Sequence, residues 1–338
     1  MRSVAADFDE RRLVLREIAE PAAPGPGEVL LRIHEVGVCG TDREIAAFRV
    51  GEPPAGERSL VIGHEALGEV VQCGAGVMDL EPGDPVVPMV RRPCSPPCAS
   101  CAAGRRDLCL SLRFSERGIF RQHGYFAEYA VDRATDLVRV PPAAVSHGVL
   151  VEPLSVVEKA IARAIALRQS DGRKALVLGL GAIGILAASA LAVRGFRVTV
   201  CSREPADHPR VRLLSAQSIR YMNSFDEASP DVILEATGAG DLALAALRRL
   251  APCGSFIVIG AMEATGTIRF GDVLLKNQAI AGIVNASPAD YEAAVEDLAR
   301  IPEEVRAGMV ARHRMEDFER TIAGPPDTAP KSVHVIDG

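Results

Sequence analysis

The sequence predicts an α/β protein of two domains, in which an irregular β-rich domain precedes a doubly wound parallel sheet. Three observations support this fold class. The chain has 338 residues, more than one hydrophobic core comfortably supports. Short apolar runs among many Gly and Pro residues fill the first part, and alternating strand and helix patterns begin after Gly172. We expect domains over residues 1–153 and 154–285, and a return segment over residues 286–338 that packs on the first domain.

The bulk composition excludes several classes of partner. Apolar residues make up 48 % of the chain and charged residues 24 %, with a net charge of −6. A negative net charge gives no attraction for nucleic-acid phosphates or anionic lipid. The amino terminus reaches Asp7 without an apolar core, so we expect no secretory signal. We therefore expect a cytoplasmic protein that binds neither nucleic acid nor membrane.

One uncharged run, residues 175–193, is long enough to suggest a membrane helix. It is rich in Gly and Ala and contains a phosphate-loop pattern. A buried parallel strand followed by a buried helix gives the same apolar run, and we favour that interpretation.

The first domain is predicted to contain short strands separated by turn residues. The apolar runs that indicate them are residues 29–33, 68–71, 85–90 and 126–131. From Pro153 onward, Leu154, Val157 and Ile161 follow helical spacing, and proline suits the first turn of a helix. We expect a long helix here that crosses from one domain to the other.

The second domain is predicted to alternate strands with helices, which is typical of a parallel doubly wound sheet. The expected strands are residues 174–178, 197–201, 231–235, 255–259 and 280–284. The expected helices are residues 182–194 and 241–250, and the tail contains one further clear helix, residues 287–300.

A glycine-rich loop, Gly179-x-Gly181-x-x-Gly184, lies between the first of these strands and its helix. Glycines there let the backbone approach a pyrophosphate, whose charge then meets the helix amino terminus. The alternative is a tight strand-to-helix turn without a ligand. The candidate cofactor contacts in this region are Gly179, Gly181, Ala182, Ile183, Gly184 and, after a later strand, Thr237.

The end of the second strand indicates which dinucleotide is preferred. An acidic residue about 20 positions after the loop would accept the ribose 2′-hydroxyl of NAD. This chain has Ser202 and Arg203 there, which can bind a 2′-phosphate. We predict that NADP is preferred and that NAD is possible. The alternative is a surface arginine that merely ends a strand.

Four of the eight cysteines fall in one cluster, Cys94-x3-Cys98-x2-Cys101-x7-Cys109. Cysteines in a chain of this type argue for metal and reduced thiols rather than disulfides. Four thiolates at such spacing suit a closed tetrahedral structural zinc. Unligated reduced thiols are the alternative.

A second possible metal site combines Cys39, His64 and Glu152. A catalytic zinc takes three protein ligands and leaves one position open. These residues supply a thiolate, an imidazole and a carboxylate, but they lie far apart in the sequence. Their spacing alone leaves open whether they converge.

A longer pattern resembles a known superfamily. Gly63-His-Glu-x-x-Gly68-x5-Gly74-x-x-Val77, followed by Gly83-Asp84, matches the signature of zinc alcohol dehydrogenases. Across nearly its whole length the chain resembles medium-chain zinc-dependent dehydrogenases, and within them the glucose dehydrogenase group. Further supporting segments are residues 39–45, 88–92, 115–119, 123–129 and 151–159. The resemblance implies a GroES-like catalytic domain and a Rossmann cofactor domain.

The resemblance also implies roles for individual residues. Cys39, His64 and Glu152 would hold the catalytic zinc. Thr41 would hydrogen-bond the reacting hydroxyl, Asp42 would orient a metal ligand, and Glu65 would be a supporting group or an exchanging ligand.

Two further residues carry weaker expectations. Glu116, together with Thr41 and Glu152, would contact the substrate, although Glu116 alone reads as a solvated loop charge. Asn285 would lie against the nicotinamide, and its alternative is a turn residue. Many alcohol dehydrogenases carry a histidine five residues after the first zinc cysteine, and this chain has Glu44.

These observations together indicate an oxidoreductase. We expect hydride transfer from the C1 hydroxyl of a glucose-like aldose to NADP or NAD, giving a lactone. The first alternative is a zinc dehydrogenase for polyols, cyclitols or modified sugars in a biosynthetic pathway. The second is a nucleotide-binding protein without turnover. The resembled family commonly forms homo-oligomers, as dimers or tetramers.

Overall fold

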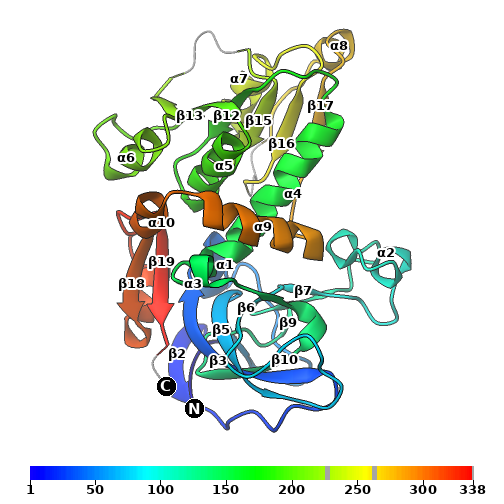
Figure 1. Cartoon of the computed structure of the whole chain (residues 1–338), viewed down its shortest axis with the longest axis vertical. Coiled ribbons are helices and arrows are strands. Elements are labelled where there is room, and N and C mark those ends of the chain that lie inside the picture. The colour runs from blue at the N-terminus through cyan, green and yellow to red at the C-terminus, as the bar shows by residue number, and fades with distance from the viewer. Residues whose placement is uncertain (225–228, 261–264, 337–338) are drawn as a thin grey trace.

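The computed structural model describes residues 1–224, 229–260 and 265–336. It forms a β-rich lobe that contains both chain ends and a second lobe built on a parallel sheet (Figure 1). The predicted α/β fold class, with an irregular β domain and a doubly wound sheet, is confirmed.

The first lobe is built around a mixed sheet whose described strands run in the order β11-β6-β5-β3-β19-β18, with β10 pairing β3. Its strands are β3 (Glu28–Gly37), β5 (Glu65–Cys73), β6 (Pro85–Pro88), β10 (Tyr129–Arg133), β11 (Leu137–Arg139), β18 (Val310–Arg314) and β19 (Lys331–Val335). Two small sheets join it, formed by β1 (Arg2–Asp7), β2 (Arg12–Glu17) and β4 (Ser59–Val61), and by β7 (Arg91–Arg92), β8 (Ser115–Arg117) and β9 (Arg121–Gln122).

The predicted strand at 126–131 is displaced. β10 begins at Tyr129, because the Phe126 amide instead donates to the Ile62 carbonyl at 3.0 Å and Ala127 forms an isolated bridge with Ser3. The predicted strands at 29–33 and 68–71 fall within β3 and β5, and the one at 85–90 runs two residues past the end of β6 at Pro88.

The second lobe contains a parallel sheet whose described strands run in the order β14-β13-β12-β15-β16-β17. They are β12 (Lys174–Leu178), β13 (Arg197–Cys201), β14 (Arg220–Met222), β15 (Val232–Glu235), β16 (Ser255–Val258) and β17 (Ala279–Gly282). The chain moves outward from β12 in one direction and then returns to β15 on its other side. Such a reversal places a ligand crevice at the carboxyl ends of β12 and β15.

Helices cover both lobes and join them (Figure 1). They are α1 (Gly40–Ala46), α2 (Ala99–Ala102), α3 (Pro142–Val145), α4 (Val151–Leu167), α5 (Ala182–Val193), α6 (Pro209–Ser215), α7 (Gly240–Leu247), α8 (Phe270–Leu275), α9 (Pro288–Arg300), α10 (Glu303–Met309) and α11 (Phe318–Ala323). Short 3₁₀ turns are η1 (Arg106–Leu108), η2 (Ala134–Asp136), η3 (Gly148–Leu150) and η4 (Met315–Asp317).

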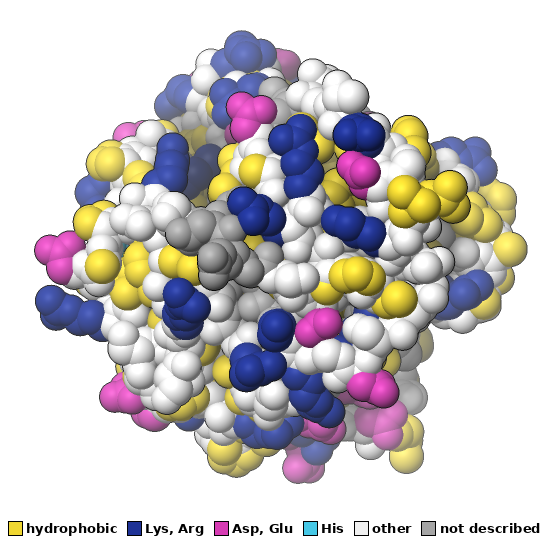
Figure 2. Space-filling model, turned by 90° about the horizontal axis from the view of Figure 1, so that it is seen from above, with side chains coloured by type: hydrophobic (Ala, Val, Ile, Leu, Met, Phe, Trp, Pro, Cys, Tyr) yellow, Lys and Arg dark blue, Asp and Glu magenta, His cyan; other side chains and the backbone are white. Residues whose placement is uncertain are grey.

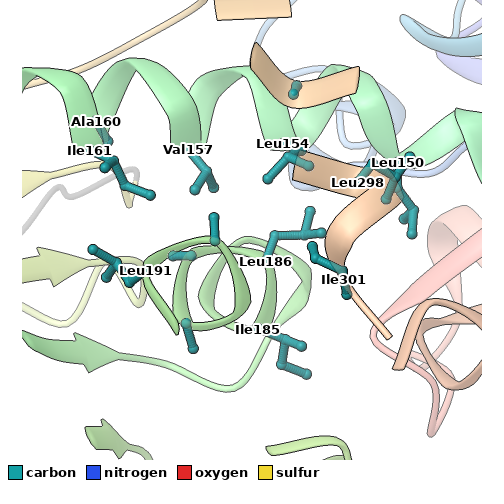
Figure 3. Packing of buried hydrophobic residues seen from close by; sticks show 14 of the residues in the cluster. Leu150, Leu154, Val157, Ala160, Ile161, Ile185, Leu186, Leu191, Leu298 and Ile301 are labelled. Carbon is teal, nitrogen blue, oxygen red and sulfur yellow. The ribbon is translucent and has the colours of Figure 1, made fainter. Parts of the chain in front are cut away.

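The long helix predicted after Pro153 is α4, and its apolar face forms the centre of the largest core. Leu154, Val157 and Ile161 point toward α5 (Figure 3) and are at most 1 % exposed. Burying each such side chain contributes roughly 1.5–3 kcal/mol, so the face that crosses the lobes is held firmly. Glu152 lies in the first turn of the same helix, which fixes that residue at the junction of the lobes.

The carboxy-terminal segment adds strands to the first sheet. β19 pairs parallel with β18 and antiparallel with β3, where Val333 lies opposite Gly37. This pairing brings Lys331 beside the loop that precedes α1, and that position matters for the site.

Lys and Arg side chains spread over the far end of the second lobe, interrupted by hydrophobic and acidic side chains (Figure 2). In the described parts of the chain, no helix is both long and apolar enough to span a bilayer.

Candidate active site

The first candidate ligand, Cys39, stands at the amino end of α1. Its backbone N–H donates to Asp42 Oδ2 at 2.8 Å, within a reciprocal capping box. The Cys39 Sγ lies 3.9 Å from Thr41 Oγ1. One short loop and helix start therefore bring a thiol, a hydroxyl and a carboxylate together.

The second candidate ligand, His64, lies between β4 and β5 and is 4 % exposed. Its Nδ1 lies 3.6 Å from Asp42 Oδ1, and neither atom has a hydrogen-bond partner among the described residues. Burial lowers the pKa of His64, but the Asp42 carboxylate beside it raises this pKa well above its usual value. A carboxylate behind the imidazole is the arrangement that orients a metal-binding histidine.

Glu65 enters the same centre from the first position of β5. Its cross-strand partner is Gly37, where a Cβ atom would lie 2.4 Å from Glu65 Oε2. The Lys331 Nζ lies 2.7 Å from Glu65 Oε1 and 2.6 Å from Oε2, and it also donates to the Val38 carbonyl. Burial lowers the pKa of Lys331, but the Glu65 carboxylate raises it overall, so the ammonium stays charged.

Ligand atoms of Cys39, His64 and Glu65 all lie within 4.8 Å of one another. Glu152, expected from the sequence as the third ligand, stands outside this group of three in the described structure. It is 7 % exposed, and its carboxylate accepts no hydrogen bond from any described residue. Burial first, and then the nearby Glu65 carboxylate, raise its pKa to about 8.

This donor set fits a zinc ion. A thiol, an imidazole and the Glu65 and Glu152 carboxylates, which are the donor types that zinc binds, lie in one buried region, and Glu65 alone is paired there with the Lys331 ammonium among the described residues. The Glu152 carboxylate, which accepts no hydrogen bond from the described residues, marks where a divalent cation would restore the charge balance.

The four-cysteine cluster lies in residues 94–109, the four-cysteine loop, which contains α2 and η1. The sulfur atoms of Cys94, Cys98, Cys101 and Cys109 all lie within 4.8 Å of one another, with Cys94 and Cys101 3.7 Å apart. A backbone hydrogen bond from Cys101 is the main cause that lowers the pKa of Cys98 to about 6. Four sulfurs at these distances fit a tetrahedral structural zinc.

The glycine loop adopts the geometry that a dinucleotide needs. Gly179 has φ = 111°, and a Cβ atom on Gly184 would lie 2.2 Å from the Gly179 carbonyl oxygen. Gly181 precedes α5, and a Cβ atom there would meet nothing within 4 Å. The loop is therefore tightly packed at Gly179 and Gly184. It leaves open space at Gly181, next to the start of the helix at Ala182 and Ile183. Thr237 faces the same loop, with its Cγ2 3.0 Å from a Cβ atom built on Gly179.

The end of β13 presents the residues expected to select the cofactor. The Ser202 Oγ lies 3.0 Å from the hydroxyl of Tyr221. The exposed Arg203 side chain makes no hydrogen bond or ion pair with any residue that the structure describes. Its guanidinium is free to bind an anion.

Glu116 and Asn285, predicted to contact substrate and nicotinamide, contact each other. Asn285 Nδ2 donates to Glu116 Oε1 at 3.0 Å across the junction between the lobes. Asn285 has φ = 59°, a left-handed conformation that asparagine tolerates better than most residues. The turn interpretation and the site interpretation are therefore compatible for this residue.

Lys331 was missed by the sequence reasoning. It opens a short strand, and in sequence it has the appearance of an ordinary surface lysine near the chain end. Only the pairing of β19 with β3 reveals that it is buried.

Comparisons with known proteins show the family to which the chain belongs. The family model of the alcohol dehydrogenase GroES-like domain matches residues 25–142, and that of the glucose dehydrogenase C-terminus matches residues 145–330. Glucose 1-dehydrogenase of Thermoproteus tenax is 40 % identical over 300 residues, which cover 85 % of this chain and 84 % of that protein. Glucose 1-dehydrogenase of Methanocella arvoryzae is 35 % identical over 323 residues, covering 89 % and 90 %.

Among solved structures, Haloferax mediterranei glucose dehydrogenase in complex with NADP, Zn and gluconolactone aligns with a TM-score of 0.90. The two sequences are 31 % identical, and the alignment covers 100 % of both chains. Fold and site thus define a zinc-dependent medium-chain dehydrogenase that uses a nicotinamide dinucleotide. Within this class, the chain belongs to the glucose dehydrogenase family.

Metal analysis tests both metal sites. We expect the purified protein to contain about two zinc ions per chain, because two separate donor sets are assembled. Cys39→Ser and Cys101→Ser should each remove one ion, as measured by mass spectrometry of the metal content. A wild-type content of one ion that only Cys39→Ser removes would show that the four-cysteine cluster holds reduced thiols.

Proposed function

We propose that this protein oxidises the C1 hydroxyl of a glucose-like aldose with NADP and releases a lactone. The observation that carries the proposal is the shared space of Cys39, His64 and two carboxylates at the junction with the dinucleotide lobe. The family relationship supports it, since a homologue aligned over its whole length was solved with NADP, Zn and gluconolactone.

For the catalytic zinc we propose Cys39, His64 and Glu152 as ligands, with Glu65 beside them. Glu65 already has a cation, because the Lys331 ammonium lies within 2.7 Å of both its oxygens. Glu152 forms no ion pair with any residue in the described ranges, and its pKa is raised to about 8 by burial and by Glu65. The carboxylate without a partner gains most from a divalent ion, whereas Glu65 is placed to support the site or to exchange.

The protein groups around this centre bind and orient the sugar. Zinc in such a site supplies Lewis acidity that lowers the pKa of an alcohol hydroxyl, and the nicotinamide accepts the hydride. Thr41 lies beside the Cys39 sulfur, where its hydroxyl can hold the reacting oxygen. Glu116 offers its second carboxylate oxygen to another sugar hydroxyl. Asp42 holds His64 from behind.

The proton cannot leave through the histidine that many alcohol dehydrogenases use. Glu44 occupies that position, and its side chain instead forms an ion pair with Arg49 at the surface. Within this proposal, the proton passes from the reacting hydroxyl to Thr41 and from there to solvent.

The cofactor is proposed to be NADP, with Ser202 and Arg203 on the 2′-phosphate. Gly179, Gly181, Ala182, Ile183 and Gly184 would form the pyrophosphate cradle. Thr237 and Asn285 would line the path toward the nicotinamide. NAD remains a possible second substrate, because nothing at the glycine loop discriminates between the two.

One feature favours a rival substrate. By the resemblance to glucose dehydrogenases, Val90 and Val156 stand where some members of that family carry polar sugar contacts, so fewer hydrogen bonds to a glucose hydroxyl are expected here. A polyol, cyclitol or modified sugar is the second candidate substrate for the same reaction.

The proposed domains follow one another along the chain. Residues 1–153 would form the catalytic domain, residues 154–285 the cofactor domain, and residues 286–338 the segment that returns to the first sheet. All eight cysteines are free, which fits a reducing compartment such as the cytoplasm.

A substrate screen tests the proposed reaction. With NADP, glucose or a close aldose should give the highest kcat/KM, and the product should be a lactone that opens to the aldonic acid. Absorbance of NADPH and chromatography of the product would measure this, with Cys39→Ser as the inactive control. A higher kcat/KM for polyols or cyclitols than for every aldose would favour the rival substrates.

Arg203→Ala tests the cofactor assignment. Removing the guanidinium should lower kcat/KM for NADP about tenfold or more relative to NAD, because a charge-assisted hydrogen bond is lost. Arg197→Ala, an exposed arginine at the start of β13, serves as the control. An unchanged NADP-to-NAD ratio in Arg203→Ala would remove Arg203 from the site.

We also propose that the chain forms a homodimer or tetramer through α8 and the sheet edge at β17. Phe270, Leu274 and Leu275 of α8 are each 76 % exposed or more. Large apolar side chains gathered in this way mark interaction surfaces. Light scattering should give a multiple of 35.8 kDa for the wild type. The double variant Leu274→Glu/Leu275→Glu should have a smaller mass, whereas Met78→Glu should not; a wild-type mass of 35.8 kDa would refute the proposal.

A further inference from the structure

The buried carboxylate of Glu116 is held through one oxygen only. Its Oε1 accepts from Arg91 Nε at 2.9 Å and from Asn285 Nδ2 at 3.0 Å. Its Oε2 accepts no hydrogen bond from any residue in the described part of the chain. A carboxylate fixed in this way presents one oriented acceptor to a ligand hydroxyl, so its position depends on the two donors.

The first donor, Arg91, is itself held by the four-cysteine loop. Arg91 lies opposite Glu116 in the β7–β8 pair, and its Nη1 donates to the Asp107 carbonyl oxygen at 3.0 Å. Its guanidinium also lies 3.7 Å from the ring centre of Phe114, which packs against the cysteine cluster. Asp107 belongs to η1, between Cys101 and Cys109.

The second donor, Asn285, is held through the same aspartate. Lys159 of α4 lies between them, because its Nζ is 2.7 Å from Asp107 Oδ2 and donates to the Val284 carbonyl at 3.1 Å. Asp107 and Lys159 are buried, so this ion pair is poorly screened by solvent. Lys159 thereby fixes the residue immediately before the left-handed Asn285.

We propose that Asp107 and Lys159 are positioning residues that fix the positions of Glu116 and Asn285. In this way the four-cysteine loop controls sugar selectivity. The backbone carbonyl of Asp107 accepts from Arg91 and so helps to hold Glu116, and the Asp107 carboxylate, the group that Asp107→Asn changes, pairs with Lys159 and so holds Asn285. The inference rests on the proposed function, because Glu116 is taken as the acceptor of a sugar hydroxyl. The inference gives the four-cysteine loop a role in substrate selection as well as in folding.

Lys159→Gln and Asp107→Asn test the proposal in the zinc-loaded enzyme. Each should raise the KM for the preferred sugar about tenfold, because a misplaced acceptor weakens one charged hydrogen bond. The KM for NADP should rise less than the KM for the sugar, because the glycine loop, Ser202 and Arg203 are untouched and only Asn285, on the proposed nicotinamide path, is disturbed. Discrimination between the sugar and its monodeoxy analogues should fall, and Lys159→Arg should restore part of it.

A double-mutant cycle separates positioning from general damage. If Lys159 acts through Glu116, the double variant Lys159→Gln/Glu116→Gln should have nearly the same sugar KM as Glu116→Gln alone. Glu158→Gln is the matched control, because the adjacent helix position pairs with Arg194 on α5, away from Glu116. It should leave the sugar KM unchanged even where the melting temperature falls.

Hydrogen exchange gives a readout that does not depend on the substrate. Lys159→Gln should speed exchange in peptides covering residues 115–117 and 284–286, whereas Glu158→Gln should not. Unchanged exchange there, or effects of Lys159→Gln and Glu116→Gln that multiply independently, would overturn the proposal. If the wild type oxidises no aldose but exchange responds as expected, the proposed function fails and the positioning role stands.

Discussion

The site depends on keeping several ionisable groups close together where water is largely excluded. An unpaired charge in such a place costs several kcal/mol, so each carboxylate needs a cation or a proton. Lys331 supplies the cation for Glu65, and it comes from the last described strand of the chain. The antiparallel pairing of β19 with β3 is therefore a condition for the chemistry as well as for the fold. Without it, Glu65 would be a buried carboxylate beside the thiol and imidazole with nothing to balance it.

The parts of the fold that could be predicted are those with a local signal in the sequence. The strands at 174–178 and 197–201 were predicted to the residue, because buried parallel strands give continuous apolar runs between clear turn signals. The last strand of this sheet was predicted over 280–284 but ends at Gly282. Apolar character at Ile283 and Val284 suggested continuation, whereas the left-handed turn at Asn285 and the Lys159 contact fix a different path. Strands β18 and β19 were not predicted individually, because β19 pairs with β3 some 300 positions earlier in the chain and β18 pairs only with β19 among the described strands.

The candidate site shows the same difference between local signals, which can be predicted, and long-range contacts, which cannot. A motif can identify Cys39, His64 and the glycine loop, because each carries its own local signal of capping, turn or spacing. The sequence cannot say which of Glu65 and Glu152 has a cation partner, since that partner lies at the other end of the chain. Lys159 did leave a weak signal, because it lies seven residues after Glu152 and so falls on the same face of α4. A lysine on an otherwise buried helical face needs a partner, and Asp107 is that partner.

The two lobes meet through directional polar contacts as well as through apolar packing. The Arg210 side chain on α6 donates to the Leu180 carbonyl in the glycine loop at 3.4 Å and to the Asp327 carbonyl at 2.7 Å. The glycine loop and the segment leading into Lys331 therefore share one guanidinium. Apolar contacts alone, such as those of α4 on α5, would tolerate small rotations of one lobe against the other. Hydrogen bonds to fixed carbonyls tolerate far less, because their strength falls steeply with angle. The distance between the dinucleotide cradle and the metal-binding cluster is thus set by backbone groups of both lobes, which is what a hydride transfer between them requires.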